Sequence, residues 1–95
     1  MPQIILVAQA VENLKALHDF IAIERPQSAQ AAVQAISNAI NRLQAFPQLG
    51  IQHEEVANIR TLIIPFGKYG YRVIYRLSAD QQIIEILTIK HHKQV

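Results

Sequence analysis

The chain has 95 residues, of which 51% are hydrophobic, and a formal net charge of +2. This length suits one folded domain, which we expect to span residues 1–95. The absence of cysteine excludes disulfides, thiolate metal ligands and cysteine nucleophiles and fits a cytoplasmic location. The N-terminal apolar run, residues 4–11, is far shorter than the roughly 20 residues that span a bilayer, so no membrane partner is expected.

Charge is distributed unevenly along the chain. Residues 1–55 carry three basic and five acidic side chains, whereas residues 56–95 carry six basic and two acidic ones. The C-terminal half is therefore the half expected to face an anionic partner. This excess is modest, because proteins that depend on many phosphate contacts usually carry more lysine and arginine.

The first half of the chain predicts a strand followed by a helical hairpin. Residues 3–8 form a short β-branched run, which is typical of a strand. From residue 11 to 23 the apolar residues recur at three- and four-residue spacing, which predicts an amphipathic helix. Pro26 interrupts that helix and suits the first turn of the next one. An alanine-rich apolar stripe continues to Leu43, and residues 46–50 (FPQLG) end the second helix.

The second half predicts a β-meander. We interpret residues 51–55 as a polar connector and expect strands over residues 56–64, 69–77 and 83–90, joined by short turns. The last strand is apolar on both faces, which favours a position inside the sheet.

Alternation along residues 71–77 assigns side chains to the two faces of the sheet. Four of them should pack on the helices: Tyr71, Val73, Tyr75 and Leu77. Arg72, Ile74 and Arg76 should lie on the opposite face. With Arg60 from the preceding strand, we expect these arginines to point outward and form a cationic working surface.

The order of these elements resembles the RelE/ParE superfamily of bacterial type II toxins. Four motifs carry the resemblance: Pro47-x-x-Gly50, Arg60-x-Leu62, Gly70-Tyr71-Arg72-Val73-Ile74-Tyr75-Arg76 and Ile86-Leu87-x-Ile89-x-His91. It covers nearly the whole chain and is closer to ParE-like, plasmid-stabilisation members. It implies an α+β fold of order β-α-α-β-β-β, in which an N-terminal helical hairpin packs on a small, mainly antiparallel sheet.

The resemblance also implies partners and a growth-inhibiting activity. Members of this superfamily are silenced by a cognate antitoxin, so a toxin–antitoxin hetero-oligomer is expected. ParE-like members block DNA gyrase, whereas RelE-like members are mRNA interferases that cleave message on the ribosome. Because one fold serves both activities, the fold does not decide between them.

Two sets of site residues follow for the two activities. A ribonuclease needs an acid, a base and cations around the phosphate, and the resemblance gives these roles to Arg72 and His91 only if the chain is RelE-like. Partner binding is predicted for the other basic residues: Arg60, Lys68, Arg76, Lys90 and Lys93. RelE-like members carry a more basic second strand, so we favour a ParE-like binder that is not an enzyme. No cofactor or metal is expected, since His91 and His92 point oppositely on a strand.

Overall fold

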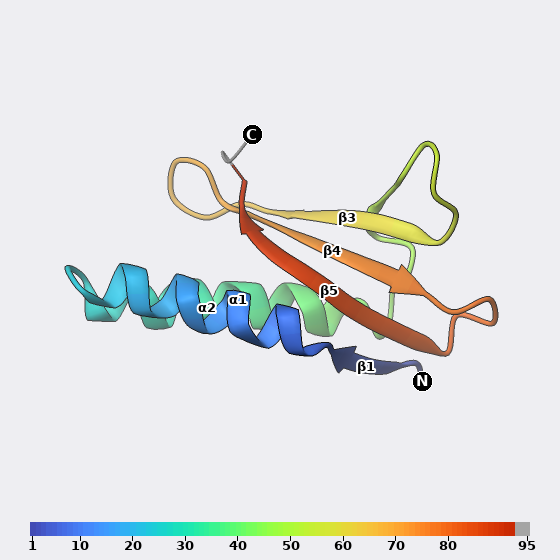
Figure 1. The fold of residues 1–95 in the computed structure, drawn as a ribbon, viewed down its shortest axis with the longest axis horizontal. Coiled ribbons are helices and arrows are strands. Elements are labelled where there is room, and N and C mark those ends of the chain that lie inside the picture. Colours follow the sequence, from blue (N-terminus) through green and yellow to red (C-terminus); the bar gives the residue numbers. More distant parts are fainter. Residues whose placement is uncertain (93–95) are drawn as a thin grey trace.

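The computed structural model describes residues 1–92 and builds them into two helices and one sheet. The elements in chain order are β1 (Gln3–Leu6), α1 (Ala8–Ala22), α2 (Pro26–Arg42), β2 (Ile51–Gln52), β3 (Ile59–Ile64), β4 (Tyr71–Leu77) and β5 (Ile83–His91). Both helices lie side by side on one face of the sheet and leave the other face open (Figure 1). This arrangement confirms the predicted α+β fold with its helical hairpin.

The order of strands across the sheet is β1-β5-β4-β3-β2. The meander β2 to β5 is antiparallel throughout, while β1 runs parallel to β5. The first and last strands of the chain are therefore neighbours, and the helical hairpin forms the connection that returns the chain to the far edge. The interior position predicted for the last strand is confirmed for its first half, where β5 lies between β1 and β4.

Several element boundaries differ from the sequence prediction. The expected connector 51–55 contains the short edge strand β2, whose two residues pair with Thr61 and Arg60 of β3. A two-residue strand has too few positions to show an alternating pattern, so sequence reasoning missed it. The following strand begins at Ile59 rather than at residue 56, because Asn58 adopts a positive φ of 67° that ends the preceding turn. Helix α1 begins at Ala8, three residues earlier than predicted.

The core lies between the helical hairpin and the inner face of the sheet. Tyr71, Val73, Tyr75 and Leu77 are all buried on that face, as the alternation predicts. From the helices, Ile36 and Leu43 are completely buried against them. Burying a side chain of this size contributes about 1.5–3 kcal/mol, so this interface supplies much of the stability.

Tyr75 connects the end of the hairpin to the sheet. Its hydroxyl donates to the Pro47 carbonyl and accepts from the Gly50 N–H, both at 2.8 Å. A Cβ at position 50 would lie only 2.7 Å from the Tyr75 ring, so glycine is required for this approach. The motif Pro47-x-x-Gly50 thus fixes where the chain enters the sheet. No helix within residues 1–92 is long and apolar enough to cross a membrane.

Candidate functional site

The predicted binding residues divide between the two faces of the sheet. Directly opposed residues of an antiparallel pair share a face, and Arg72 pairs with Lys90 across β4 and β5. Both side chains therefore belong to the open face, together with Ile63 of β3, which also pairs with Arg72. Of the predicted basic residues that the structure describes, Arg72 and Lys90 are the two that it brings together.

Arg60 does not join them, which corrects the expectation that all three arginines point outward. It pairs with Tyr75 and therefore lies on the inner face. Its Nη1 donates to the carbonyls of Gln48 and Gly50 at 3.1 and 2.7 Å. The guanidinium thus satisfies two carbonyls of the link between α2 and β2. Burial raises the pKa of Tyr75 above its ordinary value. The positive charge of Arg60 opposes this increase, but its effect is smaller.

Arg76 lies on the open face, as predicted, but its charge is matched by a neighbour. It pairs with Glu85 across β4 and β5, and its Nε and Nη2 each lie 2.9 Å from the same carboxylate oxygen. Such a partly exposed pair adds little stability. Its consequence for binding is greater, because an anionic ligand at Arg76 would have to compete with Glu85.

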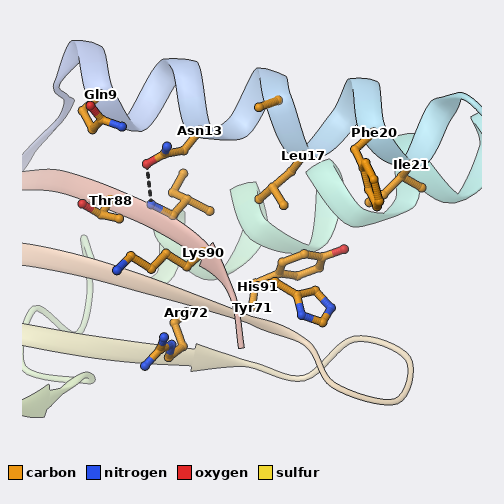
Figure 2. A pocket seen from close by; sticks show the side chains of 12 residues that line it. Gln9, Asn13, Leu17, Phe20, Ile21, Tyr71, Arg72, Thr88, Lys90 and His91 are labelled. Carbon is orange, nitrogen blue, oxygen red and sulfur yellow. Dashed lines mark hydrogen bonds between the residues drawn. The ribbon is translucent and has the colours of Figure 1, made fainter. Parts of the chain in front are cut away.

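Arg72 and His91 are separated by the pleat of the sheet. His91 pairs with Tyr71, on the face opposite to that of Arg72. Its imidazole lies edge-on to the rings of Tyr69 and Tyr71, each with a centroid distance of 5.7 Å. Figure 2 shows the imidazole beside Tyr71, while the Arg72 side chain points elsewhere. Both side chains line the groove between α1 and β5, but they reach it from opposite faces of the sheet.

The remaining predicted residues lie apart from this pair. Lys68 is in the turn between β3 and β4, with its Nζ 5.6 Å from the centroid of the Tyr69 ring, within the range of a cation–π contact. Lys93 lies outside the described residues. Within residues 1–92, no group of three or more His, Cys, Asp or Glu side chains is placed to hold a metal ion.

A groove with a volume of about 1160 Å³ lies between α1 and the second half of β5. We call it the α1–β5 groove. Gln9, Asn13 and Phe20 line it from α1, and Thr88, Lys90 and His91 line it from β5 (Figure 2). Tyr71 contributes an aromatic wall, and burial raises the pKa of its hydroxyl above the ordinary value.

Sequence reasoning did not predict the α1 side of this groove. Phe20 is 78% exposed, although it is a large apolar residue in the last turn of α1. It falls outside the stripe of Leu14, Leu17 and Ile21 that packs on the core. An aromatic residue next to an amphipathic stripe, but not in it, was the available signal for a surface that a partner covers.

A helical hairpin on one face of a small sheet, with an open opposite face and a groove along the last strand, is the RelE/ParE-like fold that the sequence suggested. The family model for the ParE toxin of the type II toxin–antitoxin system parDE matches residues 4–95. The chain therefore belongs to the ParE toxin family. No curated protein matches the sequence closely enough to count as a relative.

Solved structures agree with this assignment. The chromosomal ParDE toxin–antitoxin system from P. aeruginosa contains a chain 25% identical to this one, with a TM-score of 0.78 and 98% of each chain covered. A chain of the intact E. coli RelBE complex superposes with a TM-score of 0.68 at 8% identity, covering 99% of this chain and 100% of the other. The archaeal RelE–RelB complex from Pyrococcus horikoshii OT3 gives 0.64 at 20% identity, with 99% and 98% covered. The latter two likenesses concern the fold.

Proposed function

We propose that this toxin inhibits DNA gyrase by binding it as a protein and performs no covalent chemistry, and that a cognate antitoxin neutralises it. The observation that carries this proposal is the composition of the open face. Ile59, Ile63 and Ile74 lie across its centre, interleaved with Thr61 and Thr88. An apolar centre with a polar rim is the anatomy of a protein–protein interface.

The distribution of charge supports a protein target over a ribosome-bound message. Arg76 is matched by Glu85, and Arg60 binds backbone carbonyls on the other face. Docking on a polyanion requires many cations, and the open face, as far as the structure describes it, adds chiefly Arg72 and Lys90 to the Arg76–Glu85 pair. The proposed acid His91 and Arg72 lie on opposite faces of the sheet, and this separation supports binding over phosphodiester cleavage, which needs its acid and its cation around one phosphate.

A supercoiling assay with purified gyrase tests the proposal. The wild-type chain should inhibit supercoiling, and Ile63→Asp should weaken the inhibition at least about tenfold, because the residues that dominate binding energy cluster near the centre of an interface and cost about 2 kcal/mol or more when lost. Ile63 is 36% exposed, so the substitution changes the surface more than the core. Ile23→Asp is the matched control, since Ile23 is 82% exposed at the far end of α1 and should leave the inhibition unchanged.

Other results would assign another activity. If supercoiling is unaffected by excess toxin while primer extension on translated message reveals cuts that Arg72→Ala abolishes, the chain is an mRNA interferase. If induction without the antitoxin causes no growth defect, the chain retains only antitoxin binding.

The neighbouring structures named as toxin–antitoxin complexes support the antitoxin as partner. In this chain the exposed apolar surface that such a partner can cover lies along α1 and the adjoining edge of the sheet. Val11, Phe20 and Ile23 are all more than half exposed there. We infer that the antitoxin covers this side.

A further inference from the structure

Among residues 1–92, the second half of β5 has a strand neighbour on one side only. Strand β1 pairs with β5 from Ile83 to Ile86 and then ends. Strand β5 continues to His91, and on the other side β4 pairs with it as far as His91. Residues 87–91 therefore form an open sheet edge, which is a template for another strand unless the protein blocks it.

A β-bulge determines which backbone groups this edge presents. Ile74 pairs with Thr88 but Tyr75 pairs with Ile86, so Leu87 is the extra residue. Before the bulge, the Ile86 carbonyl faces β1 and accepts from Val7 N–H. Simple alternation would next turn Thr88 toward that side. The bulge shifts the alternation by one residue, and the Ile89 N–H turns toward α1 instead.

Asn13 occupies the position that a neighbouring strand would take. Its Oδ1 lies 3.2 Å from the Ile89 N–H and accepts a hydrogen bond from it (Figure 2). This is the same interaction that a carbonyl of an adjacent strand would supply. A side-chain amide that turns about its two rotatable bonds can release this donor at little cost, whereas a backbone neighbour such as β1 cannot.

The α1–β5 groove around Asn13 has a defined chemistry. Its far end is apolar and aromatic, with Leu17, Phe20 and Tyr71. Arg72 and Lys90 are its charged lining residues, and its lining contains no carboxylate. The groove therefore complements a segment that carries an apolar side chain and a nearby carboxylate.

We propose that Asn13 is an exchangeable cap on the β5 edge, replaced by an extended, acidic segment of the antitoxin when the toxin is neutralised. The segment pairs with residues 87–91, takes over the Ile89 N–H, places an apolar side chain against Phe20 and directs a carboxylate to Lys90. This inference rests on the proposed neutralisation by an antitoxin and specifies its surface. A protein strand is the favoured occupant, because an edge of backbone donors and acceptors is matched by another backbone.

The test uses the full chain and the protein encoded by the reading frame adjacent to its gene. Asn13→Ala removes the acceptor that competes for the Ile89 N–H, so the variant should bind the adjacent-frame protein about 2- to 10-fold more tightly than the wild-type chain does. This factor is the one that a single hydrogen bond of modest net strength represents. Asn38→Ala is the control, since Asn38 is exposed on α2 and its amide oxygen accepts a hydrogen bond from Gln34 of the same helix. Ala16→Glu places a carboxylate in the groove and should weaken binding at least tenfold, whereas Ala31→Glu, on the exposed side of α2, should not.

Amide hydrogen exchange gives an independent readout at Ile89. In the free protein, exchange at Ile89 should be faster in Asn13→Ala than in wild type, and in the complex it should be equally slow in both. Unchanged affinity of Asn13→Ala overturns the proposal, whatever Ala16→Glu does. Concentration-dependent dimerisation of Asn13→Ala would assign the edge to a second copy, and protection by an RNA oligonucleotide would assign it to nucleic acid; either overturns the proposal. If the wild-type toxin neither binds the adjacent protein nor inhibits growth, the proposed function itself has failed.

Discussion

Replacing Tyr75 by phenylalanine isolates the link between the helical hairpin and the sheet. The Tyr75 side chain is completely buried, and its hydroxyl bonds both Pro47 O and Gly50 N at 2.8 Å. A hydrogen bond contributes about 1 kcal/mol net, and a buried donor left without an acceptor costs about 1–3 kcal/mol. Gly50 is buried, so its N–H has no easy access to water. We therefore expect Tyr75→Phe to lower the free energy of unfolding by about 2–3 kcal/mol, which corresponds to about 10–20 °C in Tm for a domain of this size.

Tyr71→Phe is the matched control. Tyr71 lies on the same strand and face and is 4% exposed, but its hydroxyl borders the α1–β5 groove and makes no hydrogen bond among the described residues. Its replacement should change the unfolding free energy by less than about 0.5 kcal/mol. Urea denaturation of both variants, followed by far-UV circular dichroism, supplies the comparison. Equal midpoints for the two variants would show that the hydroxyl of Tyr75 does not hold the link together.

Three further predictions follow from local geometry and charge. Burial raises the pKa of Tyr75 above its ordinary 10.0, so the stability from this group is complete below pH 10 and is lost as pH rises through the folded pKa. The decrease in the free energy of unfolding at alkaline pH should therefore be shallower in Tyr75→Phe than in the wild-type chain. Gly70 and Gly67 both have positive φ, but a Cβ at Gly70 would overlap the Ile64 carbonyl while one at Gly67 would meet nothing. Gly67→Ala should cost about 1–2 kcal/mol and Gly70→Ala clearly more, and comparable thermal midpoints would contradict this. The Ser78 hydroxyl and Gln82 N–H lower the pKa of Asp80 below 3.8; Asp80→Asn should therefore flatten the acid side of the stability profile, where wild type loses this contribution as pH falls through the folded pKa.

The fold was largely predictable because its signals are local. The apolar stripes of the helices and the alternation of Tyr71 to Leu77 depend on spacings of two to four residues, and the structure places those side chains where the spacing predicts. The inner-face position of Arg60 was also predictable from the sequence, because Arg60 alternates in phase with the buried Leu62 and Ile64. The expectation that Arg60 points outward was wrong because it grouped Arg60 with Arg72 and Arg76 by charge and ignored the alternation of the strand.

The candidate site was less predictable because it depends on register and on strand length. Arg72 and Lys90 are 18 residues apart in sequence, and only the pairing of β4 with β5 makes them neighbours. The register between β4 and β5 likewise places Arg72 and His91 on opposite faces of the sheet. No local pattern reports that Glu85 will meet Arg76, although this contact decides how much charge the open face presents.

The sequence by itself determined the elements, their order and the side of β4 that enters the core, because turn residues and hydrophobic periodicity act within a few residues of chain. The tertiary structure alone decided that the pairing of β1 with the longer β5 stops at Ile86. It also decided that the bulge at Leu87 turns the Ile89 amide toward α1, where Asn13 accepts its hydrogen bond. These features arise between segments far apart in the chain, 76 residues in the case of Asn13 and Ile89. Their positions are fixed only when the helices pack on the sheet and bury the core between them.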